Sequence, residues 1–203
     1  MKKFMFVLMI GAMMLFAVSA FCADGKMMFG VKAGLNMTNV TGDDKPDNVS
    51  MSMGVIGGAF MCYKITDIIA VQPELLFAMK GAKADSAGFE VQWKFNYVEI
   101  PLLLKVNLPT EGKIKPSLYA GPALGILMSA KAEDEDVKEF FKSTDIGLLA
   151  GAAVGYQMEK GLLFAEARYE VGLTTIDKAE GDEDAADIKN TAISILVGYA
   201  FAF

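Results

Sequence analysis

The chain has no histidine, only two cysteines (Cys22 and Cys62) and no excess of basic residues, its formal net charge being −6. Without histidine, the usual serine–histidine arrangement of hydrolases and acyltransferases is not available, and the commonest transition-metal ligand is missing. The acidic balance also leaves no basic footprint for nucleic acid. We therefore expect a protein that is not an enzyme, with no cofactor, no metal site and no nucleic-acid partner.

Only one long apolar run exists, at residues 4–18, between Lys2 and Lys3 on one side and Ser19 and Ala20 on the other. A basic start, an apolar centre and small residues after it are typical of a secretory signal peptide. The competing interpretation is a transmembrane helix, but the run of about 15 residues is short of the roughly 20 that span a bilayer. We predict a cleavable signal peptide at residues 1–22, with cleavage after Ala20 or Cys22, and one mature domain at residues 23–203.

Loss of the signal peptide would also change the net charge and the cysteine content of the mature protein. The formal charge would move from −6 to −8 because two lysines leave with it. If cleavage follows Cys22, Cys62 is left alone and no internal disulfide can form. A protein exported without disulfides needs another source of stability, and a closed, hydrogen-bonded barrel would provide one.

Although 53% of the residues are hydrophobic, they are spread through alternating segments rather than a second long run. The last segment, 190–203, is the clearest: its odd-numbered residues are mostly large and apolar, and its even-numbered residues are mostly small. A period of two indicates a β-strand. With no polar face left for water, the pattern favours a strand that shows its large residues to lipid.

Seven more alternating segments precede this one, at residues 27–36, 54–64, 69–80, 90–106, 116–131, 144–156 and 162–173. Short connections near 65–67, 107–113 and 157–161 alternate with long ones at 37–53, 81–89, 132–143 and 174–189. Outer-membrane barrels have short periplasmic turns and long outer loops. We predict an all-β fold, an eight-stranded antiparallel up-and-down transmembrane β-barrel, with both termini periplasmic. The soluble alternative, a lipocalin-like barrel, would place its charges outside.

Two segments are irregular. Pro73 cannot donate a ladder hydrogen bond, so we expect a bulge or a missing bond there. In segment 90–106 the polar residues fall on even numbers up to Asn96, but on odd numbers from Glu99 onward. A bulge near Asn96 and Tyr97 would keep one face apolar. The alternative is that residues 89–95 form a separate loop extension.

The sequence also resembles a known family, the small PorT-like outer-membrane β-barrel proteins, often called porin-family proteins. The matching stretches are 29–36 (FGVKAGLN), 71–76 (VQPELL), 96–105 (NYVEIPLLLK), 119–122 (YAGP) and 145–148 (DIGL). The resemblance implies an eight-stranded barrel in the cell outer membrane, and the family's namesake is linked to protein secretion and maturation at the cell surface. The chain's aromatic end likewise resembles the C-terminal strand that the barrel-assembly machinery reads, with Tyr199, Phe201 and Phe203 as the signal.

The inward faces of these strands carry charges of both signs. The candidate lumen charge network consists of Lys32, Glu74, Lys80, Glu99, Lys105, Glu166, Arg168 and Glu170. We expect its centre at Glu74, Glu99, Glu166 and Arg168. Such charges must pair, because an unpaired buried ion costs several kcal/mol. They serve either a narrow path for ions or small solutes, or a structural network in a lumen too narrow for flow.

Two further sets of residues lie near the strand ends. Acidic clusters at 133–136 and 182–187 indicate either a calcium or docking site, or solvated loops. The aromatic residues that could form interfacial girdles are Tyr63, Trp93, Phe95, Tyr97, Tyr199 and Phe201, although Tyr199 and Phe201 fit an ordinary apolar wall equally well. The leading function is a structural or surface-interaction barrel, with secretion accessory as one role, and a narrow pore is the alternative. We expect outer-membrane lipid and the assembly machinery as partners, an unidentified surface or periplasmic protein partner, and a monomer.

Overall fold

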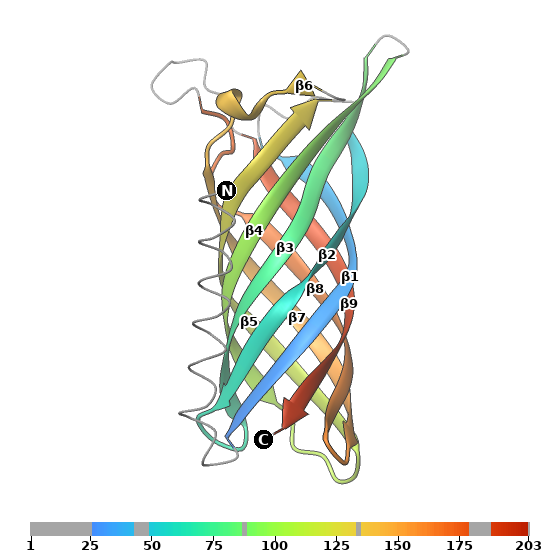
Figure 1. Ribbon diagram of the computed structural model, residues 1–203, viewed down its shortest axis with the longest axis vertical. Helices are drawn as coiled ribbons and strands as arrows, with labels where there is room; N and C mark the ends of the chain where they lie inside the picture. Colours follow the sequence, from blue (N-terminus) through green and yellow to red (C-terminus); the bar gives the residue numbers. More distant parts are fainter. Residues whose placement is uncertain (1–25, 43–48, 87–88, 133–134, 179–187, 203) are drawn as a thin grey trace, which may run out of the picture.

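Backbone pairing closes one antiparallel sheet on itself, as the computed structural model shows (Figure 1). The structure describes residues 26–42, 49–86, 89–132, 135–178 and 188–202. The barrel strands are β1 (Met27–Thr41), β2 (Val49–Lys64), β3 (Ile69–Ser86), β4 (Phe89–Asn107), β5 (Ile114–Ala132), β7 (Thr144–Met158), β8 (Gly161–Gly172) and β9 (Lys189–Ala202). A two-residue strand, β6 (Glu135–Asp136), and a short 3-10 helix, η2 (Lys138–Phe140), lie between β5 and β7.

The first and last strands complete the barrel. β1 pairs with β9 over its length, from Met28 opposite Ala202 to Thr41 opposite Lys189. Each of the eight long strands therefore has a neighbour on both sides, and their backbone groups pair within the sheet. Hydrocarbon requires this, since it offers no water to an unpaired sheet edge. The predicted eight-stranded antiparallel barrel is confirmed.

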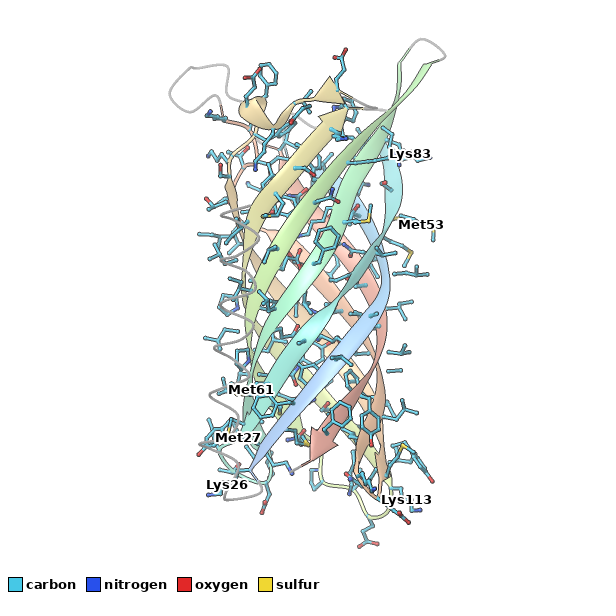
Figure 2. The ribbon with its side chains drawn as sticks, in the orientation of Figure 1. Lys26, Met27, Met53, Met61, Lys83 and Lys113 are labelled. Atoms are coloured by element: carbon cyan, nitrogen blue, oxygen red, sulfur yellow. The ribbon has the colours of Figure 1, made fainter. Side chains whose placement is uncertain are left out.

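The polarity of the barrel is inverted relative to a soluble protein. Apolar side chains such as Leu102 and Val197 are 52% and 61% exposed on the outer wall, whereas Lys32 and Glu74 are buried in the lumen at 3% and 1%. Met53, 69% exposed, projects from the wall in Figure 2. An apolar outer face around a polar interior is the arrangement of a barrel in lipid. The lipocalin-like alternative, which needs charges outside, does not fit.

Several strands run further than the sequence pattern predicted. β1 continues to Thr41 and β2 begins at Val49, while β3 and β4 extend the sheet to Ser86 and Phe89. The predicted loops at 37–53 and 81–89 are correspondingly shorter. The reason is that ladder hydrogen bonds continue past the end of the apolar stripe, whereas the sequence signal relies on that stripe. No helix among the described residues is long and apolar enough to cross a membrane.

A register shift occurs at the expected level of the barrel, between Asn96 and Tyr97, but the extra residue lies on the neighbouring strand. Asn96 pairs with Ser129 and Tyr97 pairs with Leu127, which leaves Met128 of β5 without a partner. A bulge of this kind inserts one residue into one strand of a pair. β4 keeps its register with β3 through this region. The register shift predicted near Asn96 and Tyr97 is therefore confirmed, but its extra residue lies on β5 and not within segment 90–106, and a separate loop at 89–95 is wrong.

Because β4 does not change phase, its aromatic side chains point inward. Phe95 and Tyr97 are 2% and 1% exposed and pack in the lumen, where half-buried Trp93 joins them. The girdle position predicted for these aromatics is wrong. Tyr63 and Phe201 do lie on the outer wall, 43% and 46% exposed, and the Tyr199 and Phe201 rings meet edge to face at 4.8 Å.

The irregularity expected at Pro73 is confirmed as a gap in the ladder. Pro73 pairs with Leu102 of β4, but it has no partner on β2. The register between β2 and β3 is the same on both sides of this gap, from Phe60 opposite Glu74 to Tyr63 opposite Val71. The missing N–H of proline is thus accommodated without a bulge.

Some predicted features lie outside the described residues. These are the signal peptide at 1–22 with both cleavage sites, Phe203 of the C-terminal signal, and the acidic positions 133–134 and 182–187. Glu135 and Asp136, the other part of the first acidic cluster, form β6 and are exposed.

The inverted polarity makes a prediction for the middle of the wall. Leu102→Arg would place a charge in hydrocarbon, so we expect the free energy of unfolding to fall by about 2–4 kcal/mol. The measurement is reversible urea unfolding of the protein refolded in lipid vesicles. Leu173→Arg, a substitution at an equally exposed residue (57%) close to the loop end, is the matched control and should cost roughly 0–1 kcal/mol. Equal costs for the two variants would contradict the lipid-facing assignment.

Candidate functional site

The charged residues predicted to face the lumen are found inside the barrel. Seven are buried, with exposures from 1% to 8%: Lys32, Glu74, Lys80, Glu99, Glu166, Arg168 and Glu170. The eighth, Lys105, is half-buried. Their ion pairs divide them into two groups, of which the one around Lys80 lies nearer the loop end of β3.

The first group, here called the ionic quartet, consists of Lys32, Glu74, Glu166 and Arg168. The Lys32 ammonium lies 2.6 Å from Glu74 and 2.8 Å from Glu166. Arg168 lies 3.1 Å from Glu74 and 2.6 Å from Glu166. Two cations thus share two carboxylates, and the group is neutral. Its side chains are 0–2% exposed, so the pairs are screened very little by water.

A polar chain extends the ionic quartet toward the turn end of the barrel. Gln72 donates a hydrogen bond to Glu74 at 2.7 Å, and Lys105 donates one to Gln72 at 3.3 Å. Lys105 therefore joins the group through an amide rather than through an ion pair. The buried carboxylate of Glu74 accepts hydrogen bonds from lysine, arginine and glutamine, which offsets its desolvation.

The second group contains one cation and two carboxylates. The Lys80 ammonium lies 2.7 Å from both Glu99 and Glu170, and it donates a hydrogen bond to Glu170. Neither carboxylate oxygen of Glu99 accepts a hydrogen bond from the described residues, because the close contact with Lys80 has poor hydrogen-bond geometry. Glu99, expected at the centre of the network, thus lies with Lys80 rather than with the quartet.

A third bridge, made of hydrogen bonds rather than ion pairs, lies nearer the loop end. Asn190 donates hydrogen bonds to Asp145 at 2.8 Å and to the Tyr97 hydroxyl at 3.3 Å. Thr174 donates to the other oxygen of Asp145 at 3.2 Å. Lower down, Ser194 donates to Asn36 at 2.8 Å.

These bridges connect opposite walls of the barrel. In the circular strand order, β3 and β8 are separated by three strands on either side, as are β4 and β9. The Glu74–Arg168 and Lys80–Glu170 pairs join β3 to β8, and Asn190 joins β9 to Tyr97 of β4. The lumen is therefore crossed at three heights by direct side-chain contacts.

Apolar clusters close the lumen beyond the polar bridges. Toward the turn end, the rings of Phe60 and Phe164 meet edge to face at 5.5 Å, together with buried Cys62. These rings fit because a Cβ at Gly30 would collide with Phe60, and one at Gly198 would collide with Phe164. Small residues on the inner face thus make room for large ones on the neighbouring strand.

At the loop end, the segment after β6 folds back over the opening. Phe141 packs its ring 4.8 Å from that of Phe95, and it forms a bridge with Asp177. The buried members of this cap are Val40, Ala82, Phe95, Tyr97, Leu127, Ala130 and Ile176. The cap therefore joins the two loop segments on either side of β7 and β8 to the inner wall.

The sequence did not predict the part of the lumen that is bridged by hydrogen bonds. Asp145, Asn190, Asn36 and Ser194 are all on inward positions of their strands, and alternation alone could have identified them. Asn36, Asn190 and Ser194 carry no charge, and Asp145 stands at the start of its strand, so the pattern of charges along the strands does not mark them. Among the described residues, no group of three acidic, cysteine or histidine side chains lies close enough to hold a metal ion.

The closed antiparallel sheet, the apolar outer wall and the charged, bridged lumen together define a small transmembrane β-barrel. A family model described as "Outer membrane protein beta-barrel domain" matches residues 19–178. The chain belongs to this family, and it is a protein of the cell outer membrane. A comparison with curated proteins finds no match.

Two solved structures share the fold. Neisserial surface protein A is similar with a TM-score of 0.56 and 18% identity, covering 86% of this chain and 97% of that chain. The outer membrane protein OprG from Pseudomonas aeruginosa has the same TM-score with 13% identity, covering 87% of this chain and 95% of that chain. At these identities the likeness concerns the fold alone.

The ionic quartet makes a stability prediction. Glu74→Gln leaves Lys32 and Arg168 facing a single carboxylate, so one buried positive charge is uncompensated. We expect the free energy of unfolding to fall by about 3–5 kcal/mol. The measurement is urea unfolding in lipid vesicles, with the temperature at which the folded band disappears on an unboiled gel as a second readout.

Two further variants test whether the uncompensated charge causes the loss of stability. Lys32→Met combined with Glu74→Gln leaves the neutral pair of Arg168 and Glu166, and it should be more stable than Glu74→Gln alone. Glu159→Gln, an exposed carboxylate in the turn after β7, should behave like the unchanged protein. If Glu74→Gln matched Glu159→Gln, the quartet would contribute nothing to stability.

Proposed function

We propose that this protein is a sealed structural barrel that carries a surface for interactions at its loop end, and that it is neither a pore nor an enzyme. The observation that carries the proposal is the ionic quartet, a neutral, buried group that joins opposite walls. A conducting lumen needs a water-filled path, and these pairs are essentially inaccessible to water. The apolar layers above and below them add two further barriers.

The loop end supports the interaction part of the proposal. Phe140 of η2 is 62% exposed, and exposed Asp136 and Glu139 lie close to it in sequence. Exposed aromatic residues surrounded by polar ones are common anchors at protein interfaces. Since the segment is tied to the barrel through Phe141, it can present Phe140 in a defined position. An accessory role in secretion, as the resemblance to PorT-like proteins implies, is one use of such a surface.

We propose that the loop end faces outward and that both termini are periplasmic. The two longest connections, between β5 and β7 and between β8 and β9, lie at the end opposite to the start of β1 and the end of β9 (Figure 1). This arrangement is usual for outer-membrane barrels. It also places the outward aromatics Tyr199 and Phe201 at the periplasmic end, where the assembly machinery would meet them.

Conductance separates the sealed barrel from a pore. In planar lipid bilayers we expect the unchanged protein to produce no steady channels, because its lumen side chains cross the path. The double variant Glu74→Ala with Arg168→Ala should show rare or small openings at most, since the apolar layers remain. Reproducible channels from the unchanged protein, absent from a mock preparation, would reject the sealed barrel and favour the narrow pore.

Cysteine labelling tests the orientation. Phe140→Cys should react with a membrane-impermeant maleimide on intact cells, whereas Lys160→Cys, in the turn after β7, should react only after the outer membrane is opened. The native Cys62 is 2% exposed and buried in the lumen, so the unchanged protein serves as the background control. The reverse labelling pattern would place the termini outside.

A further inference from the structure

The bulge at Met128 shifts the inward and outward alternation of β5 by one residue, so the residues that follow it exchange faces. Below the bulge, Leu127 is 2% exposed and faces the lumen; above it, Ala130 is 0% exposed and also faces the lumen. Strict alternation without the extra residue would send Ala130 outward and Lys131 inward. With the bulge, Ser129 and exposed Lys131 lie on the outer wall.

The neighbouring strand presents matching residues at the same height. On β4, Phe95 and Tyr97 face the lumen, so Lys94 and Asn96 lie on the outer wall, and Lys94 is exposed. The register places Lys94 directly opposite Lys131 and Asn96 opposite Ser129.

Two hydrogen bonds connect residues of this region. Asn96 donates to the Ser129 hydroxyl at 2.8 Å, and the Lys138 ammonium donates to the Met128 carbonyl oxygen at 2.9 Å. The basic wall patch consists of Lys94, Asn96, Ser129, Lys131 and Lys138.

The two facing lysines, Lys94 and Lys131, repel each other. Like charges directly opposite each other on neighbouring strands are destabilising. Among the described residues, neither Lys94 nor Lys131 forms an ion pair. Asp136 of β6 pairs with Lys131 through the backbone ladder, yet it makes no ion pair with it, and its carboxylate accepts a hydrogen bond from the Lys138 backbone. The other acidic residues of this segment that the structure describes, Glu135 and Glu139, likewise form no ion pair with Lys94, Lys131 or Lys138, so the ammonium groups of Lys94 and Lys131 lie without a carboxylate partner among the described residues.

The patch borders the lipid-facing wall. The next outward side chains toward the middle of the barrel are apolar, including Met128 and Ile126 on β5, which are 38% and 36% exposed, and Ile100 on β4, which is 41% exposed. Cations at this level meet the headgroups of the bilayer rather than its hydrocarbon.

Because two exposed lysines face each other without an ion-pair partner among the described residues, where the apolar wall ends, we propose that the basic wall patch binds the phosphate of an anionic lipid headgroup. The lysines would donate charge-assisted hydrogen bonds to the phosphate oxygens. The polar groups of Asn96 and Ser129 lie beside them. The lipid would also remove the repulsion between Lys94 and Lys131, so its binding should stabilise the fold.

The test is native mass spectrometry of the folded full-length barrel in neutral detergent, with phosphatidic acid or phosphatidylcholine added. We expect preferential retention of phosphatidic acid. Its affinity should fall about fivefold for each lysine removed, and on the order of twentyfold for Lys94→Gln with Lys131→Gln. Lys94→Arg with Lys131→Arg keeps the charge and should keep the preference.

The matched control is Lys113→Gln with Lys160→Gln, which removes the same charge from the turn end of the barrel. Figure 2 shows Lys113 at the opposite end of the barrel from Lys83 of β3, which is two residues from Gly81, the partner of Lys94 on that strand. Unboiled gels check that every variant is folded. An equal loss of affinity in the control and in the wall-patch variant would overturn the proposal, as would equal retention of the two lipids by the unchanged protein. Competition by inorganic phosphate alone, with no preference for the lipid, would also overturn it.

Discussion

Pairing of every strand on both sides is the constraint on which the rest of the structure depends. Hydrocarbon leaves no alternative partner for a backbone N–H or C=O group, so the sheet must close, and it closes where β1 meets β9. Once eight strands form a circle, the size of the lumen is set. The inner side chains must then fill a narrow space, which explains why large rings such as Phe60 lie opposite glycines such as Gly30.

The same closure decides what the charges can do. In a wide barrel, Lys32 or Arg168 would be hydrated, but here each reaches carboxylates on other strands within 3.1 Å. Pairing across the lumen removes charge and water together. A buried ion pair contributes little stability in itself, because desolvation offsets attraction, although breaking one is costly. The ionic quartet is therefore better understood as a device that keeps opposite walls in register than as a source of net stability.

Much of the fold was predictable because alternation is a local signal. The alternation around a residue such as Leu102 or Lys32 indicates whether its side chain faces outward or inward. Eight such alternating segments predict an eight-stranded barrel. The strand ends near Thr41 and Ser86 were not predictable, since hydrogen bonding continues where the apolar stripe has stopped. Nor were the partners of Glu99 and Glu166, because alternation gives the face of a side chain but not the residue across the lumen.

The phase change near Asn96 shows this limit most clearly. A change in the polar pattern of one strand can arise from a bulge in that strand or from a change of environment along it, and the sequence does not distinguish the two. Here the interior changes from charged to apolar at Tyr97, and the compensating extra residue is Met128 on the neighbouring strand. The bulge places Ala130 in the apolar cap, and the same one-residue shift places Lys131 on the outer wall beside Lys94. One inserted residue therefore links the sealing of the lumen to the charge of the wall that faces the lipid headgroups.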